Sequence, residues 1–184
     1  MDKLPSEFLR ACRQTPVRLT HHLLLVSVAR QRMRLWEAAT ETLFHVSHRE
    51  YLLRREYVIS TSRFGSGQIK DSNQTPLGLH RVARKIGAGQ PVGTVFRARQ
   101  PVGFTWQGQP EAAIAHRILW LEGLQPGFNR GGNCDTFERY IYIHGLGDEL
   151  TLGRPASRGC VHMAAADLLP LFDRVPRGTL VWIQ

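Results

Sequence analysis

The sequence is poor in cysteine and lacks a long apolar run. Its 184 residues include three cysteines, Cys12, Cys134 and Cys160, which are too few and too scattered for a disulfide framework. No apolar segment approaches the roughly 20 residues that a transmembrane helix needs, so we expect no membrane insertion. Charged residues make up a moderate 21%, which together with ordinary apolar content excludes a disordered chain.

An export signal is also missing in any convincing form. The best candidate, LLLVSVA at 23–29, follows a long segment with acidic residues and prolines. It is barely long enough for the apolar part of a signal peptide. The scarcity of cysteine agrees with a reducing compartment. We therefore expect a cytoplasmic protein, with the periplasm as the alternative if a signal sequence has been removed.

Acidic residues are outnumbered by basic ones, by nine, and nearly all of the excess is arginine. Such a balance suits nucleic acid or a small anionic substrate. The basic stretches RQRMRLW (30–36) and LLRREY (52–57) are short, and no nucleic-acid-binding motif accompanies them. We therefore expect no nucleic-acid partner and favour a small anionic one.

Most of the chain has the pattern of short strands bounded by glycine or proline. The pattern predicts a hairpin at 22–28 and 32–37, and strands at 55–61, 91–99, 113–123, 138–145 and 178–183. Helices are predicted only at 3–13 and 164–175, and Pro170 should distort or split the second. The fold class is therefore mostly β with minor α, arranged as a single-domain sandwich or barrel-like sheet.

The stretch HGLGDELTLGRPASRGCVHM at 144–163 concentrates residues capable of chemistry. Alternation in the preceding strand places Tyr140, Tyr142 and His144 on one face. His144 ends that strand before a glycine, which suits a rigidly held base. Later in the stretch, Cys160 follows Gly159, and this small neighbour lets substrate and backbone approach the thiol closely.

A nucleophilic thiol needs thiolate character, access and donors for an oxyanion. Arg158 and a nearby imidazole would favour the thiolate, and the amides of Gly159 and Cys160 would supply the donors. The residue pattern alone also allows an inert buried thiol. A third possibility is a zinc site made by His144, Cys160, His162 and Cys134, although no CxxC or HExxH motif supports it.

The same residues resemble the signature of the YkuD-type L,D-transpeptidase catalytic domain. That signature is His-Gly, a loop, and then Ser-His/Arg-Gly-Cys-Val/Ile-Arg/His. Upstream, LLLVSVARQRMRLWE is similar to the opening hairpin of the family. YVISTS is similar to the segment before its first loop, and TPLG to its Thr-Pro-x-Gly turn. The resemblance covers residues 22–184 and leaves 1–21 as an N-terminal extension. It implies a mixed β-sheet of that catalytic domain type.

The resemblance further implies which residues act and on what. Cys160 would be the nucleophile and His144 the acid and base, assisted by Arg158 and Gly159. The substrate would contact Ser157, Tyr142, Gly145 and His162. It would be a peptidoglycan stem peptide or muropeptide, cleaved between diaminopimelate and D-Ala without metal or cofactor. The family commonly has histidine at position 158 and arginine at 162, so the resemblance implies either that the two basic functions are exchanged here or that His162 contributes less.

The acceptor of the acyl group is not defined by these residues. We expect water, and hence an L,D-carboxypeptidase in peptidoglycan recycling; the alternative is an L,D-transpeptidase that forms cross-links with an amine. A rival of another class is an inactive binding module for wall peptides. The arginines at 97, 99, 117 and 139 are candidates for binding the carboxylates of the substrate.

The polar loop at 62–74 is either a lid over the substrate or an ordinary surface loop.

Overall fold

Strands dominate the part of the chain that the computed structural model describes, residues 3–39 and 50–184. The elements follow in the order α1 (Ser6–Gln14), β1 (His22–Ser27), β2 (Arg32–Ala38), β3 (Tyr51–Ser60), β4 (Gly78–Ile86), β5 (Thr94–Arg97), β6 (Gln100–Phe104), β7 (Ala115–Gly123), the short 3₁₀ helix η1 (Gly132–Cys134), β8 (Tyr142–Gly145), β9 (Val161–Met163), α2 (Ala165–Arg174) and β10 (Leu180–Ile183). None of the helices in this part of the chain is both long and apolar enough to cross a membrane.

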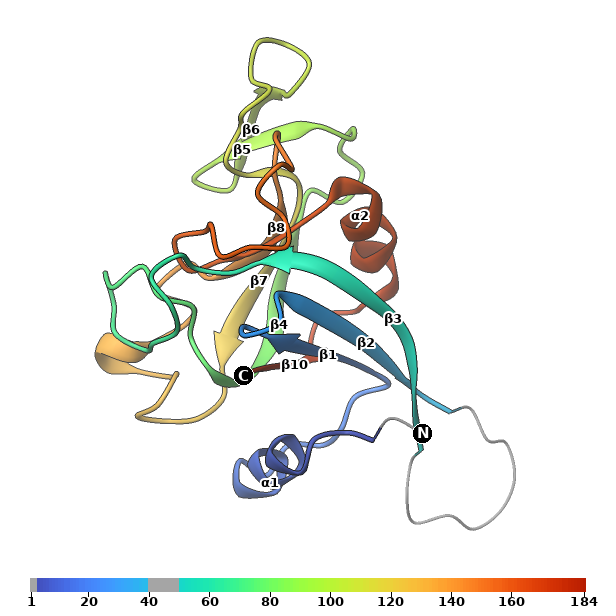
Figure 1. Ribbon diagram of the computed structural model, residues 1–184, viewed down its shortest axis with the longest axis vertical. Coiled ribbons are helices and arrows are strands. Elements are labelled where there is room, and N and C mark those ends of the chain that lie inside the picture. Colours follow the sequence, from blue (N-terminus) through green and yellow to red (C-terminus); the bar gives the residue numbers. More distant parts are fainter. Residues whose placement is uncertain (1–2, 40–49) are drawn as a thin grey trace.

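Eight of the strands close into a barrel. Their order is β4-β10-β1-β2-β3-β9-β8-β7, and β4 pairs with both β10 and β7, which completes the ring. The pairs β1–β10 and β8–β9 are parallel and the others antiparallel, so the sheet is mixed. The hairpin β5–β6 continues from β7 outside the ring and projects at one end of the molecule (Figure 1).

The barrel interior is the main hydrophobic core. Every strand of the ring contributes to it through alternate side chains, as on β8 and β9, where Ile143 and Val161 point inward. Helix α2 completes this core with Leu168, Leu171, Phe172 and the following Val175. Burial of this apolar surface is the principal driving force for the fold.

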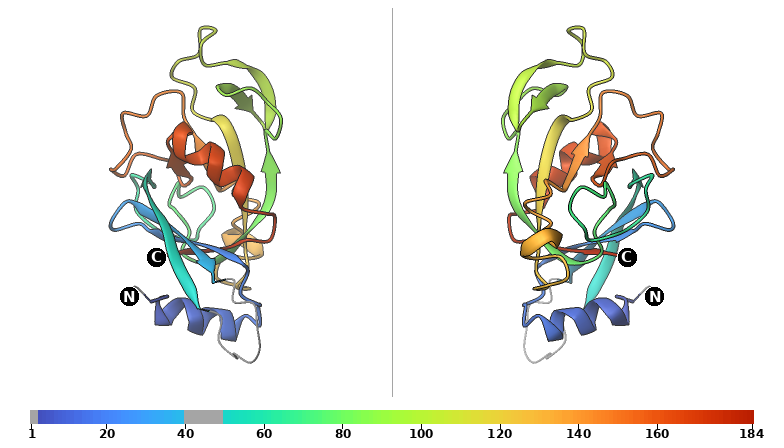
Figure 2. Two further views of the ribbon diagram at one scale, coloured as in Figure 1. Left: turned by 90° about the vertical axis from the view of Figure 1, so that its right-hand side faces the viewer. Right: turned by 90° about the vertical axis from the view of Figure 1, so that its left-hand side faces the viewer.

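A second apolar layer explains why β1 has a continuous apolar run. Leu24 and Val26 face the interior, whereas Leu23 and Leu25 pack on the outer face in a cluster that includes Phe8 of α1. A strand buried on both faces needs apolar residues at every position. Helix α1 therefore covers the barrel wall at the end opposite the β5–β6 hairpin, as the two side views show (Figure 2).

The pattern-based predictions are confirmed for the opening hairpin, the last strand and both helices. Pro170 lies inside α2 and does not split it, which corrects that expectation. The strand expected at 138–145 begins only at Tyr142, because Tyr140 adopts a left-handed φ of 55°. The sequence pattern had placed Tyr140 in the alternation of that strand, and this expectation was wrong. Strands β4, β6 and β9 were not predicted.

The core position of α2 makes a stability prediction. Phe172 is 1% exposed, so Phe172→Ala should lower the free energy of unfolding by about 3–5 kcal/mol through lost burial and a residual cavity. Chemical denaturation measures this loss. The neighbouring Asp173 is exposed, and Asp173→Ala should change stability by less than about 0.5 kcal/mol. Equal losses in the two variants would contradict the packing of α2.

Candidate functional site

The parallel pairing of β8 with β9 brings the histidine and cysteine of the motif together. His144 is in register with His162, and the backbone N–H of Tyr142 lies 3.4 Å from Cys160 Sγ. Because side chains alternate, Tyr142, His144, Cys160 and His162 share the outer face of this ladder. The imidazole and the thiol are thus diagonal neighbours, although no direct hydrogen bond joins them.

His144 is held in one tautomer. Its Nδ1 lies 2.9 Å from the carbonyl oxygen of Gly145; a carbonyl only accepts, so Nδ1 carries the proton and Nε2 is a free base. Burial lowers the pKa of His144 to about 4, against the smaller raising effect of the Gly145 bond. At neutral pH the ring is therefore uncharged, and its Nε2 is available to accept a proton.

Cys160 lies at the edge of an aromatic cluster. The cluster includes Trp120, Phe137 and Tyr142, with the rings of Trp120 and Phe137 stacked at 4.1 Å between centroids. Burial raises the pKa of the Cys160 thiol to about 11, although the Tyr142 amide and the charge of Arg139 act in the opposite direction. The resting side chain is therefore a neutral thiol.

The backbone before Cys160 is shaped by Ser157 and Gly159. The Ser157 hydroxyl donates to the Cys160 carbonyl at 2.6 Å and accepts from the Gly159 amide at 3.1 Å. Gly159 has a φ of +119°, which side chains disfavour, and a Cβ there would lie 3.3 Å from the Gln74 carbonyl oxygen. The Gly159 amide, expected as an oxyanion donor, is thus engaged by Ser157 in this structure.

Arg139 holds the polar loop at 62–74 together with Thr75, called the 62–75 loop below, against the site, and the sequence pattern contained no sign of this. Its Nη1 donates to the carbonyls of Gly67 and Gln68 at 3.0 and 2.8 Å, and its Nη2 to that of Gln74 at 2.6 Å. The same guanidinium lowers the Cys160 pKa by its charge. Arg139 is thereby used inside the protein rather than offered to a substrate carboxylate.

Beside this loop lies a cavity of about 220 Å³. Arg158 is exposed and lines it together with Lys70, Asp71, Asn73, Glu138, Arg139, Tyr140 and Ile141. Cys160 does not itself line the cavity, but its Sγ lies 3.5 Å from the carbonyl oxygen of Tyr140, which does. Arg158 therefore lines a cavity near the thiol, on the side of the 62–75 loop.

His162 occupies the position at which the family commonly has arginine. Its ring contacts that of His144, with centroids 4.8 Å apart, and its Nδ1 is buried without a hydrogen-bond partner. Burial, with a smaller effect from His144, lowers the pKa of His162 to about 3. It therefore brings no positive charge to the site.

The remaining candidate arginines lie in different surroundings. Arg117 donates to the His116 carbonyl and lies over the ring of Phe172. Arg97 is exposed on β5, on the opposite side of the strand from Phe96, which joins the aromatic cluster. Arg99 lies over Trp120, a member of the aromatic cluster against which Cys160 packs. Arg99 alone of these three borders the aromatic cluster through its guanidinium.

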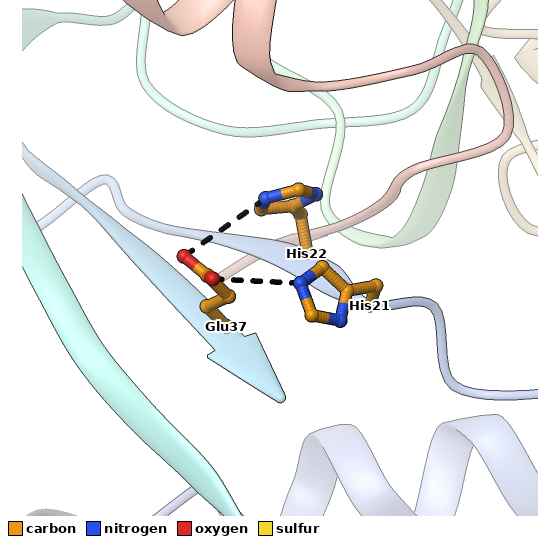
Figure 3. A group of neighbouring side chains, drawn as sticks. All are labelled: His21, His22 and Glu37. Carbon is orange, nitrogen blue, oxygen red and sulfur yellow. Dashed lines mark ion pairs between the residues drawn. The ribbon is translucent and has the colours of Figure 1, made fainter. Parts of the chain in front are cut away.

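A cluster of potential metal ligands lies on another part of the barrel wall. His21, His22 and Glu37 have donor atoms within 4.8 Å of one another (Figure 3). However, Glu37 Oε2 also lies 3.5 Å from Arg54 and 3.9 Å from Arg174. The carboxylate is already neutralised by two guanidinium groups, so a divalent cation would enter a positively charged group. We read the cluster as an ion-pair network.

The family model for the YkuD L,D-transpeptidase catalytic domain matches residues 21–183. The chain belongs to this family. Among curated proteins, none matches the chain. The YkuD domain therefore gives the enzyme class, that of the L,D-transpeptidase family, and the matched range includes β8 and β9.

Solved structures with a TM-score of 0.50 or more have the same fold. Bd1075 of Bdellovibrio bacteriovorus is 14% identical with a TM-score of 0.54, over 90% of this chain and 48% of that one. The L,D-transpeptidase LdtMt1 in complex with imipenem is 13% identical with a TM-score of 0.50, over 89% and 59%. An L,D-transpeptidase from Mycobacterium smegmatis is 13% identical with a TM-score of 0.49, over 89% and 58%. The YkuD chain thus spans about half to three-fifths of their length.

The neutral thiol leads to a pH prediction. With a pKa of about 11 for Cys160, alkylation by iodoacetamide should be slow at pH 7 and should accelerate with pH up to about 11, because the thiolate reacts. Mass spectrometry of the labelled peptide measures the rate, with Cys160→Ala as the control for Cys12 and Cys134. A rate that reaches a plateau below pH 7 would instead indicate a thiolate–imidazolium pair.

The Arg139 contacts lead to a second prediction. Arg139→Met removes the donors to Gly67, Gln68 and Gln74, so amide hydrogen exchange in the 62–75 loop should become about 10-fold faster or more, since each bond to a charged donor is worth about 1.5–3 kcal/mol. Arg158→Met is the matched control, because this exposed arginine also lines the cavity. Equal exchange in both variants would contradict the fastening role of Arg139.

Proposed function

We propose that this domain is an L,D-carboxypeptidase that cleaves the bond between diaminopimelate and D-alanine in peptidoglycan stem peptides. One observation carries the proposal: a cysteine and a histidine with a free Nε2 share the outer face of two paired strands. Membership of the YkuD family gives the reaction class. Neither the geometry of the two side chains nor the family membership depends on the net charge of the protein.

In the first step the thiol of Cys160 attacks the diaminopimelate carbonyl. Its proton passes to Nε2 of His144 as the carbon–sulfur bond forms, so neither group needs to be charged beforehand. The tetrahedral oxyanion collapses, the carbon–nitrogen bond breaks, and the proton on His144 goes to the amine of D-Ala. A thioester on Cys160 and free D-Ala result.

In the second step His144 deprotonates a water molecule, which attacks the thioester and releases the shortened tripeptide and the thiol. Water is the proposed acceptor because the net charge of +9 attracts small anionic muropeptides, and such soluble substrates place no second stem beside the thioester. The proposal includes a cytoplasmic location, which fractionation of the native protein would test. An amine in place of water would give a cross-link.

The reaction predicts a defined product. Incubation with a disaccharide-tetrapeptide should release D-Ala with addition of water, and Cys160→Ala should abolish the release. His144→Ala should lower kcat about 10²- to 10⁴-fold, the range for a general acid–base group. Mass spectrometry follows the product, and Cys134→Ala serves as a control because its thiol bonds to Gly131, away from β8 and β9.

The acceptor is decided in the same assay by adding D-amino acids or a second stem peptide. An unchanged tripeptide product supports the carboxypeptidase, whereas D-amino-acid exchange or a dimer would identify a transpeptidase. Absence of any Cys160-dependent product would leave a binding module for wall peptides and overturn the proposed reaction.

A further inference from the structure

Arg99 extends from the turn between β5 and β6 over the aromatic surface next to the nucleophile. Its guanidinium carbon lies 5.1 Å from the ring centre of Trp120 and 4.8 Å from that of Tyr140. Its Nη1 lies 3.4 Å from the hydroxyl of Tyr142, whose own amide contacts Cys160 Sγ. One residue, Tyr142, therefore links this cation to the thiol.

The charge of Arg99 has no carboxylate partner among residues 3–39 and 50–184. Arg34, Arg55 and Arg81 each form an ion pair with a carboxylate, whereas no such group lies within 4.0 Å of Arg99. The contact with Tyr142 uses one of five guanidinium N–H donors. A guanidinium on aromatic rings is weakly hydrated and presents a planar fork, which suits a carboxylate.

The backbone that carries Arg99 is unusual. Arg97 pairs with Gln100, so Ala98 and Arg99 form a two-residue turn, with φ values of 47° and 69°. Such turns favour asparagine and glycine because other residues are strained at positive φ. Arg99 therefore adopts this turn conformation at a cost in conformational energy. The turn places the guanidinium of Arg99 over the rings of Trp120 and Tyr140.

We propose that Arg99 binds the free carboxylate of the residue that leaves, and so makes the enzyme selective for stem peptides ending at that residue. The inference rests on the proposed function, because it takes the scissile carbonyl to lie at Cys160. The carboxylate then lies one residue further along, about 3.8 Å between successive Cα atoms. The paired donors of Arg99 bind it in bidentate fashion, beside Tyr142.

Two substrates separate this role from simple packing: a tetrapeptide with a terminal D-Ala carboxylate, and the same peptide ending in a carboxamide. The wild type should prefer the acid. Arg99→Met should lower kcat/KM for the acid about 10- to 100-fold, the range for a charge-assisted bond, and leave the amide unchanged. Arg99→Lys should restore part of the preference, because lysine keeps the charge without the fork.

Arg97→Met is the matched control, because this exposed arginine lies in the same hairpin and points away from the aromatic cluster. It should keep the wild-type ratio of acid to amide. If Arg99→Met lowers the melting temperature but keeps that ratio as well, Arg99 only packs on Trp120 and the proposal is overturned.

Binding measurements keep the two proposals apart. Calorimetry with Cys160→Ala protein, with and without Arg99→Met, compares the affinity for the acid and the amide without turnover. Affinity for the acid that depends on Arg99, with no release of D-Ala by the wild type, would sustain the carboxylate site and refute the reaction. Turnover without a preference for the acid would refute the site alone, and no binding of either peptide would refute both.

Discussion

The parallel pairing of β8 with β9 is the contact on which the site depends. Neither strand carries the chemistry alone, since His144 lies on β8 and Cys160 directly precedes β9. The register is fixed from the other side, where Ile143 and Val161 are paired and both fully buried in the barrel. A slip by one residue would turn these apolar side chains out and His144 in. The hydrophobic core therefore holds the thiol and the imidazole on one face.

Desolvation gives the resting site its electrostatic character. Burial raises the pKa of Cys160 and lowers those of His144 and His162, so all three side chains are neutral at physiological pH. A buried charge without a partner would be costly, and the neutral pair avoids this cost. In the proposed reaction, charge would appear only while bonds are changing, and the donors and cations around the substrate would then stabilise it.

The sequence led to the candidate site through local features and missed what depends on distant contacts. Strand alternation and the His-Gly and Gly-Cys spacing drew attention to His144 and Cys160, and the resemblance to the YkuD family assigned them their expected roles. The role of Arg139 was not accessible, since its partners are carbonyls some 65 to 72 positions away. Pro170 was expected to break a helix, but the burial of Leu168, Leu171 and Phe172 holds α2 together. Strand β4 was not predicted because its charged second half has a weak strand pattern and is paired with the distant strand β7.

Closure of the barrel also bears on how this protein behaves at high concentration. The eight strands form a closed ring, and one open border of the sheet lies at the β5–β6 hairpin, which continues outside the ring. Its outer strand, β6, contains Pro101 and Gly103 among only five residues. Proline has no N–H to offer to a neighbouring chain, and glycine weakens a strand. At this border a second copy of the chain would therefore find a poor template for adding to the sheet.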